Sequence, residues 1–280
     1  MKRHAYDGTP RKVATRKMPQ KDTYEMRVVH EDWEAVYRGN PLQDRLNGLL
    51  MDRVMAHIAL PPDALCLDAG CGVGYHSLAI ARRGARCLGI DISETVLHTA
   101  RANLASSGLS QRLSFCCEEL ERLSFADATF DVVHCRGVLM HIPNWEAALA
   151  ELCRVLKPGG SIVVMEANSV SVEAWMVRLL RYLRRPRSRL VAAPGGLEFW
   201  SELHGHPFVV RMADLERLTA HLETCRVRIV TRFATELFDI YRFPAGPARN
   251  AIIRLNHLWF RLRLPASLSA GNALVGRKAP

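Results

Sequence analysis

The sequence predicts an α/β protein whose core is a doubly wound sheet of parallel strands with helices on both faces. From residue 65 onward, short apolar runs alternate with stretches of helical period, the pattern of such a sheet. The runs are continuously apolar, as expected of strands buried on both faces. A glycine-rich turn directly follows the first run.

The expected elements follow one another in order. Strands are predicted at residues 64–70, 86–92, 112–118, 130–136 and 161–167, with helices at 75–83, 94–106 and from 144 to a Lys-Pro-Gly-Gly stop at 157–160. Asn144 is the expected cap of that last helix. A helix at 212–223, a strand at 226–233 and an apolar run at 271–278 complete the core. We therefore expect the sheet scaffold to comprise residues 60–166, 211–234 and 270–278.

Two stretches interrupt this pattern and are interpreted as insertions, at 167–210 and 235–268. The first joins an arginine-rich amphipathic segment to one rich in Pro, Gly and aromatic residues. We expect it to form, with the helices that precede the sheet, a lid over the substrate. Residues 1–22 are basic and contain Pro10 and Pro19, which predicts a disordered tail before a domain spanning 23–280.

Composition places the chain among globular proteins. It has 280 residues, of which 49% are hydrophobic and 24% charged. No apolar stretch is long enough to cross a bilayer and no secretory signal is visible, so a cytoplasmic location is expected. The eight cysteines form no CxxC pair, which favours small core hydrophobes over a metal or redox site.

The net charge of +10 is concentrated in the N-terminal tail and at residues 178–189 and 249–264. Solvated helix faces, an anionic substrate and a membrane surface remain three possible interpretations of the basic stretches. In the second stretch, apolar residues can share a stripe: Ile252, Leu255, Leu258, Trp259 and Leu262. That stripe supports contact with a membrane surface. It could equally pack on the domain or on a second subunit, so a monomer and a homodimer both remain open.

The glycine turn points to a nucleoside cofactor. Gly70, Gly72 and Gly74 give GxGxG, whereas the dinucleotide fingerprint needs a small residue where Tyr75 stands. The Gly-Lys-Ser/Thr ending of a phosphate loop is also missing. Asp91 ends the next strand, about 20 residues on, where a carboxylate accepts hydrogen bonds from ribose hydroxyls.

With these features in place, the chain resembles the class I S-adenosylmethionine-dependent methyltransferases of the small-molecule type. The resemblance covers residues 65–166 and is carried by "LDAGCGVG", "GIDIS", "EELERLSFADATFDVVHCRGVLMHIPN" and "ALAELCRVLKPGGSIVVME". It implies a Rossmann-like seven-stranded sheet that ends in an antiparallel strand. It also implies S-adenosyl-L-methionine as cofactor, and a structural role for "RVLKPGG".

The resemblance further implies which residues hold the cofactor, from its methionine end through its ribose to its adenine. These are Asp68, Gly70, Gly72, Gly74, Cys135, Arg136, Asp91, Ile92, Glu119 and Leu120. Asp91 is expected at the ribose. Glu119 stands where the family often has Asp and is expected at the adenine amino group.

Candidates for the acceptor side are fewer. His141 follows the fourth strand and is interpreted as a general base or a substrate contact, since histidine titrates near neutrality; packing is the alternative. His204 and His206 in the aromatic insertion, and Trp33 and Tyr37 in the helical stretch before the sheet, are further candidates for substrate contact. No metal site is expected, because nothing near the two insertion histidines completes a ligand shell.

Two polar residues of the fourth strand are interpreted as structural. Asp131 lies at the start of this strand, away from the reacting end, and is expected to act as a cap. His134 lies inside the strand and is expected in the core or behind the site.

These observations predict methyl transfer to a small or medium-sized acceptor, with oxygen favoured over nitrogen and carbon because histidines are available as bases. Glycan, polyketide-like aromatic and lipid-precursor acceptors are all open. The charge suggests RNA or protein as alternative substrates, but no Asn-Pro-Pro-Tyr motif or Pro-Cys nucleophile supports a nucleic-acid partner. An NAD(P)-dependent oxidoreductase and a non-catalytic cofactor-binding protein are the alternatives of another class.

Overall fold

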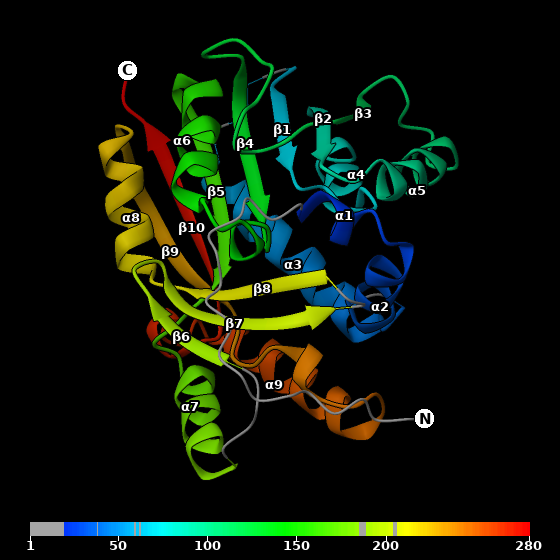
Figure 1. Ribbon diagram of the computed structural model, residues 1–280. Helices are drawn as coiled ribbons and strands as arrows, with labels where there is room; N and C mark the ends of the chain where they lie inside the picture. Colours follow the sequence, from blue (N-terminus) through cyan, green and yellow to red (C-terminus); the bar gives the residue numbers. More distant parts are fainter. Residues whose placement is uncertain (1–19, 38, 59, 62, 185–188, 204–205) are drawn as a thin grey trace.

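A mixed sheet of seven strands, in the order β3-β2-β1-β4-β5-β10-β9, forms the centre of the molecule (Figure 1). The computed structural model describes residues 20–280 except 38, 59, 62, 185–188 and 204–205. The strands are β1 Leu65–Ala69, β2 Arg86–Asp91, β3 Leu113–Cys117, β4 Phe130–Arg136, β5 Leu156–Ala167, β9 Val227–Glu236 and β10 Gly271–Lys278. The predicted seven-stranded Rossmann-like sheet is therefore confirmed.

Strand direction sets which ends meet. The strands β3, β2, β1, β4 and β5 are parallel, whereas β10 is antiparallel to both of its neighbours, β5 and β9. Two strands that are each antiparallel to β10 must run in the same direction. The carboxyl end of β9 therefore lies at the same edge of the sheet as the carboxyl ends of β1, β2, β4 and β5.

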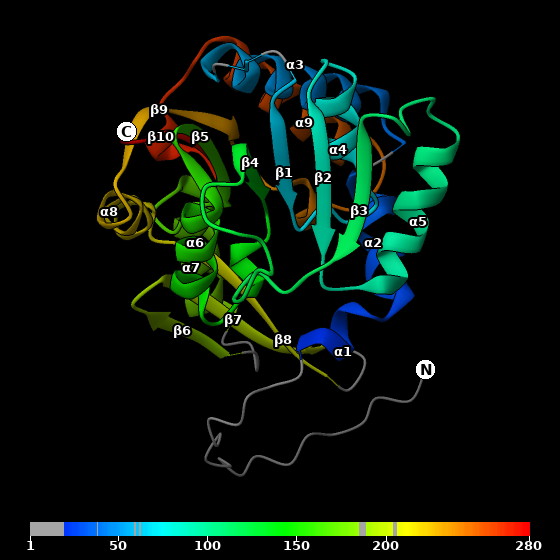
Figure 2. The same ribbon diagram turned by 90° about the horizontal axis from the view of Figure 1, so that it is seen from above.

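Helices cover both faces of this sheet (Figure 2). One face carries α3 (Pro41–His57), α4 (Tyr75–Ala81), α5 (Glu94–Ala105) and α9 (Pro247–Arg261); the other carries α6 (Trp145–Val155) and α8 (Leu215–Thr224). Leu50, Leu97 and Phe260 contribute to the first core and Leu149 and Leu218 to the second. The continuous apolar runs of the strands thus serve two cores, as their pattern predicts.

A second, three-stranded antiparallel sheet crosses the carboxyl edge of the first (Figure 1). It consists of β6 Arg189–Ala193, β7 Gly196–Leu203 and β8 His206–Ala213, and follows helix α7, Val172–Arg184. The sequence predicts an insertion at 167–210 but not these strands. Its Pro and Gly residues interrupt the period, and two of them, Pro194 and Gly195, form the turn of the β6–β7 hairpin.

Before the sheet, α1 (Gln20–Tyr24) and α2 (Arg27–Tyr37) form the expected helical stretch. Short 3-10 turns stand at Leu139–His141, Ile240–Arg242 and Ala266–Leu268. The predicted tail lies outside the described residues except for 20–22, which belong to α1. Among the described residues, no helix is long and apolar enough to cross a membrane. The cysteines are free thiols, and five of the eight are buried.

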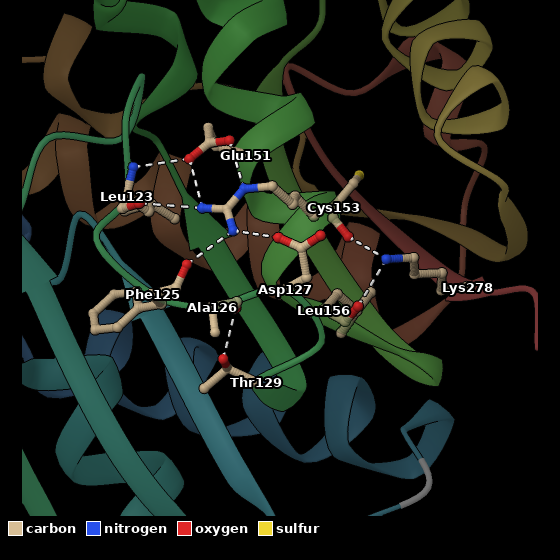
Figure 3. A network of polar contacts seen from close by, with 10 residues as sticks. Leu123, Phe125, Ala126, Asp127, Thr129, Glu151, Cys153, Leu156 and Lys278 are labelled. Atoms are coloured by element: carbon tan, nitrogen blue, oxygen red, sulfur yellow. Dashed lines mark hydrogen bonds and ion pairs between the residues drawn. The ribbon is translucent and has the colours of Figure 1, made fainter.

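The segment "RVLKPGG" anchors α6 to its surroundings (Figure 3). The Arg154 guanidinium forms ion pairs with Glu151 and Asp127 and donates to the backbone oxygens of Leu123 and Phe125. Lys278, near the end of the chain, donates to the carbonyl oxygens that end α6 and begin β5. The structural role implied for this segment agrees with these contacts.

One detail of α6 differs from the prediction. Asn144 precedes the helix, but its side chain forms no capping hydrogen bond. At the other end, the Lys-Pro-Gly-Gly stop is already part of β5, which begins at Leu156 directly after the helix. The start of α6 is therefore not fixed by the residue that the sequence pattern indicates.

Candidate functional site

A cavity of about 640 Å³ opens at the carboxyl edge of the main sheet. Its wall takes residues from the ends of five strands, namely Gly70 after β1, Asp91 on β2, Arg136 on β4, Glu166 on β5 and Glu236 on β9. Helices α2 and α7 and strand β8 complete the wall. In open α/β sheets, the crevice at the carboxyl ends of the strands is where ligands bind.

The glycine turn forms one side of the cavity. Gly70, Gly72 and Gly74 have φ of 68°, 54° and 81°, a region that side chains disfavour. A Cβ on Gly70 would lie 2.3 Å from a methyl group of Val138, and one on Gly74 would lie 2.6 Å from the ring of Phe115. Gly70 and Gly72 line the cavity, whereas Gly74 packs behind it.

Asp91 ties this turn to β2. One carboxylate oxygen accepts a hydrogen bond from the Gly72 amide at 3.0 Å, and the other accepts one from the Ser93 amide at 3.1 Å. Burial raises the pKa of Asp91, while these two amides and the nearby His30 lower it. Each oxygen keeps acceptor capacity toward the cavity. The arrangement fits a ligand with paired hydroxyl donors, such as a ribose.

Asp68 does not line the cavity. Its carboxylate is buried, pairs with Nδ1 of His134 at 2.8 Å and accepts a hydrogen bond from the Ser77 hydroxyl. His134 is likewise buried, as predicted. The hydrogen bond between Ser77 on α4 and Asp68 on β1 holds this helix against the strand directly behind the glycine turn.

The adenine end predicted from the resemblance forms one continuous wall. Ile92, Glu119 and Leu120 all line the cavity beside Asp91. Neighbouring Glu118 also lines it, but its carboxylate already accepts hydrogen bonds from the amide and hydroxyl of Ser124. The structure thus brings together the residues predicted at this end.

Of the two residues predicted to contact the cofactor at the end of β4, only one lines the cavity. Arg136 lines the cavity and donates to Nε2 of His76 at 3.1 Å and to the Asn47 side chain at 3.3 Å. Cys135 is fully buried and does not line the cavity, and its burial raises the pKa of the thiol. Neighbouring residues of a strand point to opposite faces, so only one of the two reaches the ligand side.

The N-terminal helices close over the cofactor end. The Glu25 carboxylate accepts hydrogen bonds from the Ser93 hydroxyl and the Thr95 and Glu94 amides, all between 3.1 and 3.2 Å, at the start of α5. Burial raises the pKa of Glu25, but these hydrogen bonds outweigh it and hold the pKa below its usual value. No sequence pattern indicates these hydrogen bonds, because their partners are about 70 residues apart.

His141 lies in the cavity wall on a 3-10 turn. Its ring centroid is 5.9 Å from that of Tyr24 and 5.2 Å from that of Phe208, and Nδ1 is 3.0 Å from the carbonyl oxygen of Val209. Burial lowers the pKa of His141 to about 4; the charge of Arg211 also lowers it, and the Val209 carbonyl raises it. The imidazole is therefore neutral near pH 7 and a weak base.

The remaining predicted residues lie partly outside the described part of the chain. Trp33 and Tyr37 are on α2, which contributes His30 and Glu34 to the wall, but their own side chains are not described. His206 begins β8 and its side chain is likewise not described, while His204 lies outside the described residues. Asp131 accepts a hydrogen bond from the Leu65 amide and pairs with Lys157, the structural role expected of it.

Acidic residues that the sequence analysis did not identify line the far end of the cavity. They are Glu166, Glu173, Glu236 and Asp239, with Arg242 among them. Glu173 pairs with Arg242 and accepts a hydrogen bond from the Asp239 amide at 2.6 Å. Glu166 ends the stretch "ALAELCRVLKPGGSIVVME", but no local motif marks the other four. Neither here nor in the rest of the described chain does a group of three or more His, Cys, Asp or Glu side chains have an arrangement that could hold a metal ion.

Residues 67–164 match the family model described as a methyltransferase domain. The chain is 37% identical over 142 residues to a ubiquinone biosynthesis O-methyltransferase of Hahella chejuensis, covering 50% of this chain and 58% of that protein. A ubiquinone biosynthesis O-methyltransferase of Methylococcus capsulatus is 34% identical over 212 residues, covering 72% of this chain and 85% of that protein. A sterol 4-C-methyltransferase of Caenorhabditis elegans is 32% identical, covering 46% of this chain and 39% of that one.

The chain thus spans about half the length of the Hahella chejuensis and Caenorhabditis elegans relatives that it matches. Among solved structures, a SAM-dependent methyltransferase from Methanosarcina mazei is similar with a TM-score of 0.55 and 25% identity, covering 79% of this chain and 94% of that one. The cyclase SpnF has a TM-score of 0.62 at 21% identity, covering 94% and 96%. The second likeness concerns the fold alone.

Proposed function

This chain belongs to the class I S-adenosylmethionine-dependent methyltransferase family, and we propose that it transfers a methyl group from that cofactor to an oxygen atom of a small or medium-sized acceptor. One observation carries the proposal: a single cavity joins the glycine turn and Asp91 to an end with ionisable groups. The cofactor end and the acceptor end would then share one enclosed space, as a direct transfer requires.

The residues described above fit the cofactor at each of its parts. We assign the ribose to Asp91, the adenine to Ile92, Glu119 and Leu120, and the methionine part to the glycine turn and Arg136. Asp68 supports the turn from behind. When bound, the cofactor supplies a methyl group on a cationic sulfur, so the chain's own task is to align the acceptor and exclude water.

Oxygen is our preferred acceptor atom for two reasons. Several relatives carry the name ubiquinone biosynthesis O-methyltransferase, and the far end of the cavity offers carboxylates that could take a hydroxyl proton. The sterol C-methyltransferase among the relatives makes a carbon acceptor the second candidate. An RNA or protein substrate gains no support from these relatives.

Calorimetry with S-adenosylmethionine, S-adenosylhomocysteine and NADH in parallel tests the cofactor assignment. We expect the first two to bind and NADH not to bind. Binding of NADH alone would return the chain to the oxidoreductase alternative. Binding without methyl transfer to any hydroxylated acceptor would favour a non-catalytic cofactor-binding protein.

For the partners, we propose that α7 contacts an anionic membrane surface on the cytoplasmic side. Apolar side chains occupy an arc of about 140° on this helix at 100° per residue, and all are at least 40% exposed: Trp175, Met176, Leu179, Leu180 and Leu183. Residues 174–197 include six arginines and no acidic residue. This combination is typical of helices that lie flat at a lipid interface.

Position also supports this partner. Helix α7 extends beyond the carboxyl edge of the sheet (Figure 1), and Glu173 in its first turn lines the cavity. An apolar acceptor could therefore pass from the bilayer to the cavity along the helix. Helix α9 packs on the domain through Ile253, Asn256 and Phe260. Its own stripe stays exposed at Leu255, Leu258 and Leu262, so α9 is the second candidate for this contact.

Vesicle sedimentation tests the membrane contact. We expect the chain to pellet with phosphatidylcholine vesicles that contain phosphatidylglycerol, and not with phosphatidylcholine alone. The double variant Trp175→Ala, Leu179→Ala should lose this binding, whereas Leu258→Ala on α9, a matched exposed site, should keep it. Equal pelleting of both variants would refute the role of α7.

A further inference from the structure

The far end of the cavity is separated from the cofactor end by the order of the strands. Asp91 ends β2 and Glu236 ends β9, with β1, β4, β5 and β10 between them in the sheet. Neighbouring strands lie about 4.8 Å apart, so the backbones of the two strand ends that carry these residues are roughly five strand spacings, about 24 Å, apart along this edge, and both side chains line the space between them. The cofactor residues take the β3-β2-β1-β4 side, which leaves the side of β5, β10 and β9 for the acceptor.

Glu236 lies directly against the sheet at that end. The register pairs it with Gly271 on β10, and both residues line the cavity. A Cβ on Gly271 would lie 2.9 Å from Cγ and 3.1 Å from Oε1 of Glu236. The missing side chain of Gly271 is what leaves room for the carboxylate to rest over the strand ends.

Among the acids of this end, Glu236 differs in its hydrogen bonds. Glu173 is paired with Arg242 and with the Asp239 amide, and Glu166 accepts from the amides of Val138 and Leu139. No described residue donates a hydrogen bond to the Glu236 carboxylate. A half-buried acid in a cavity that the described part of the chain leaves without a donor is available to a ligand.

The surroundings of Glu236 tune its proton affinity toward the range that proton transfer needs. Burial raises the pKa of Glu236 to about 8, together with the negative charges of Asp239 and Glu173, while Arg136 on β4 lowers it. General bases work best when their pKa is near the operating pH.

We propose that the β5-β10-β9 end of the cavity is the acceptor subsite and that the Glu236 carboxylate is the general base that takes the proton from the acceptor's hydroxyl group. In this step the O–H bond breaks and its proton passes to a Glu236 oxygen. The acceptor oxygen bonds to the methyl carbon as the methyl–sulfur bond breaks, and that electron pair stays on sulfur. The proton on Glu236 then leaves to water. This inference rests on the proposed O-methylation.

Two other groups in the wall are less suited to this role. His141, with its pKa near 4, is a weak base whose ring packs between two aromatic side chains. Glu166 has a pKa raised by burial to about 7, but one of its oxygens holds backbone amides and the other is buried without a partner. An acceptor hydroxyl can approach neither as freely as Glu236.

The test compares Glu236→Gln with Glu223→Gln, an exposed control on α8. The probes are catechol, whose hydroxyl must lose a proton, and 4-nitrocatechol, which is largely ionised near neutral pH. We expect Glu236→Gln to lower turnover of catechol about 100-fold or more, the usual contribution of a general base. Turnover of 4-nitrocatechol and the affinity for S-adenosylmethionine should change little, and the control should match the unaltered chain.

An infrared titration supplies a second readout that needs no acceptor. The unaltered chain and the Glu223→Gln control should show a protonated-carboxyl band that is lost in two steps, around pH 7 from Glu166 and around pH 8 from Glu236, and Glu236→Gln should lack the step at pH 8. Equal losses for the two catechols, or a pH 8 step that survives in Glu236→Gln, would overturn the role of Glu236. Failure to bind S-adenosylmethionine would instead refute the proposed function, so the two failures are distinguishable.

Discussion

The two ends of the cavity are built differently. At the cofactor end, Gly70, Gly72, Asp91 and Ile92 come from one strand-turn-helix-strand unit, and the carboxylate is held by backbone amides. The acceptor end draws its residues from strands and helices between residues 166 and 271. It holds acids whose pKa values burial has raised, Glu236 above all. The cofactor end is a local unit whose carboxylate is already held by hydrogen bonds, which suits the binding of one fixed ligand. The acceptor end joins residues far apart in the chain and holds a carboxylate without a described donor, which suits proton transfer.

The largest effect should come from the cofactor end. Asp91→Ala removes the proposed ribose acceptors, and two hydrogen bonds to a charged group contribute about 1.5–3 kcal/mol each. We expect the affinity for S-adenosylmethionine to fall about 10²–10⁴-fold in calorimetry. Asp127→Ala, an exposed acid outside the cavity, should bind normally. Retained affinity in Asp91→Ala would break the proposed division of the cavity.

The second largest effect is expected on stability, from a substitution in the glycine turn. Gly74→Ala places a side chain at φ of 81° and 2.6 Å from the ring of Phe115, so we expect a loss of about 2–3 kcal/mol in the free energy of unfolding. Gly108→Ala has a similar φ of 74° but open space, and isolates the backbone cost of about 1 kcal/mol. Chemical denaturation measures both. Equal losses would show that packing against Phe115 does not hold the turn.

At the acceptor end, pH should separate stability from binding. The folded pKa of Glu236 is raised to about 8, so the stability gained by holding its proton is full below the ordinary pKa near 4.5 and lost as pH rises through 8. At pH 9, the free energy of unfolding of Glu236→Gln should therefore be about 1–3 kcal/mol higher than that of the unaltered chain. At pH 4 the two free energies should be equal. Glu223→Gln serves as the control in thermal melts. An unchanged slope with pH would contradict the buried, uncompensated state of Glu236.

The smallest effect is expected at His141. Since this ring is neutral above about pH 4, His141→Ala should lower turnover less than about tenfold through lost packing, about 1 kcal/mol. Cofactor affinity and the pH profile between 6 and 9 should stay unchanged. His98→Ala, an exposed histidine on α5, is the control. A shifted pH profile would restore His141 as the base and weaken the assignment to Glu236.

How much could be predicted from the sequence differs between these ends for a physical reason. The glycine turn, Asp91 and Ile92 are recognisable because their roles depend on neighbours within about 20 residues. Cys135 shows the limit even there, since strand alternation puts it in the core beside Arg136 on the ligand side. The β6-β7-β8 sheet was missed because its strands are defined by pairing with one another and not by their own period.

The sequence by itself determined the order of strands and helices, the cofactor turn and the family, because period and turn chemistry are local properties. Tertiary structure alone decided that β9 runs in the same direction as β5 on the other side of β10, that Glu25 joins α1 to α5, and that Glu236 rests over Gly271. These depend on contacts between residues far apart in the chain. Burial in such contacts is also what sets a pKa, so the reactivity of the acceptor end emerges only when the chain has folded.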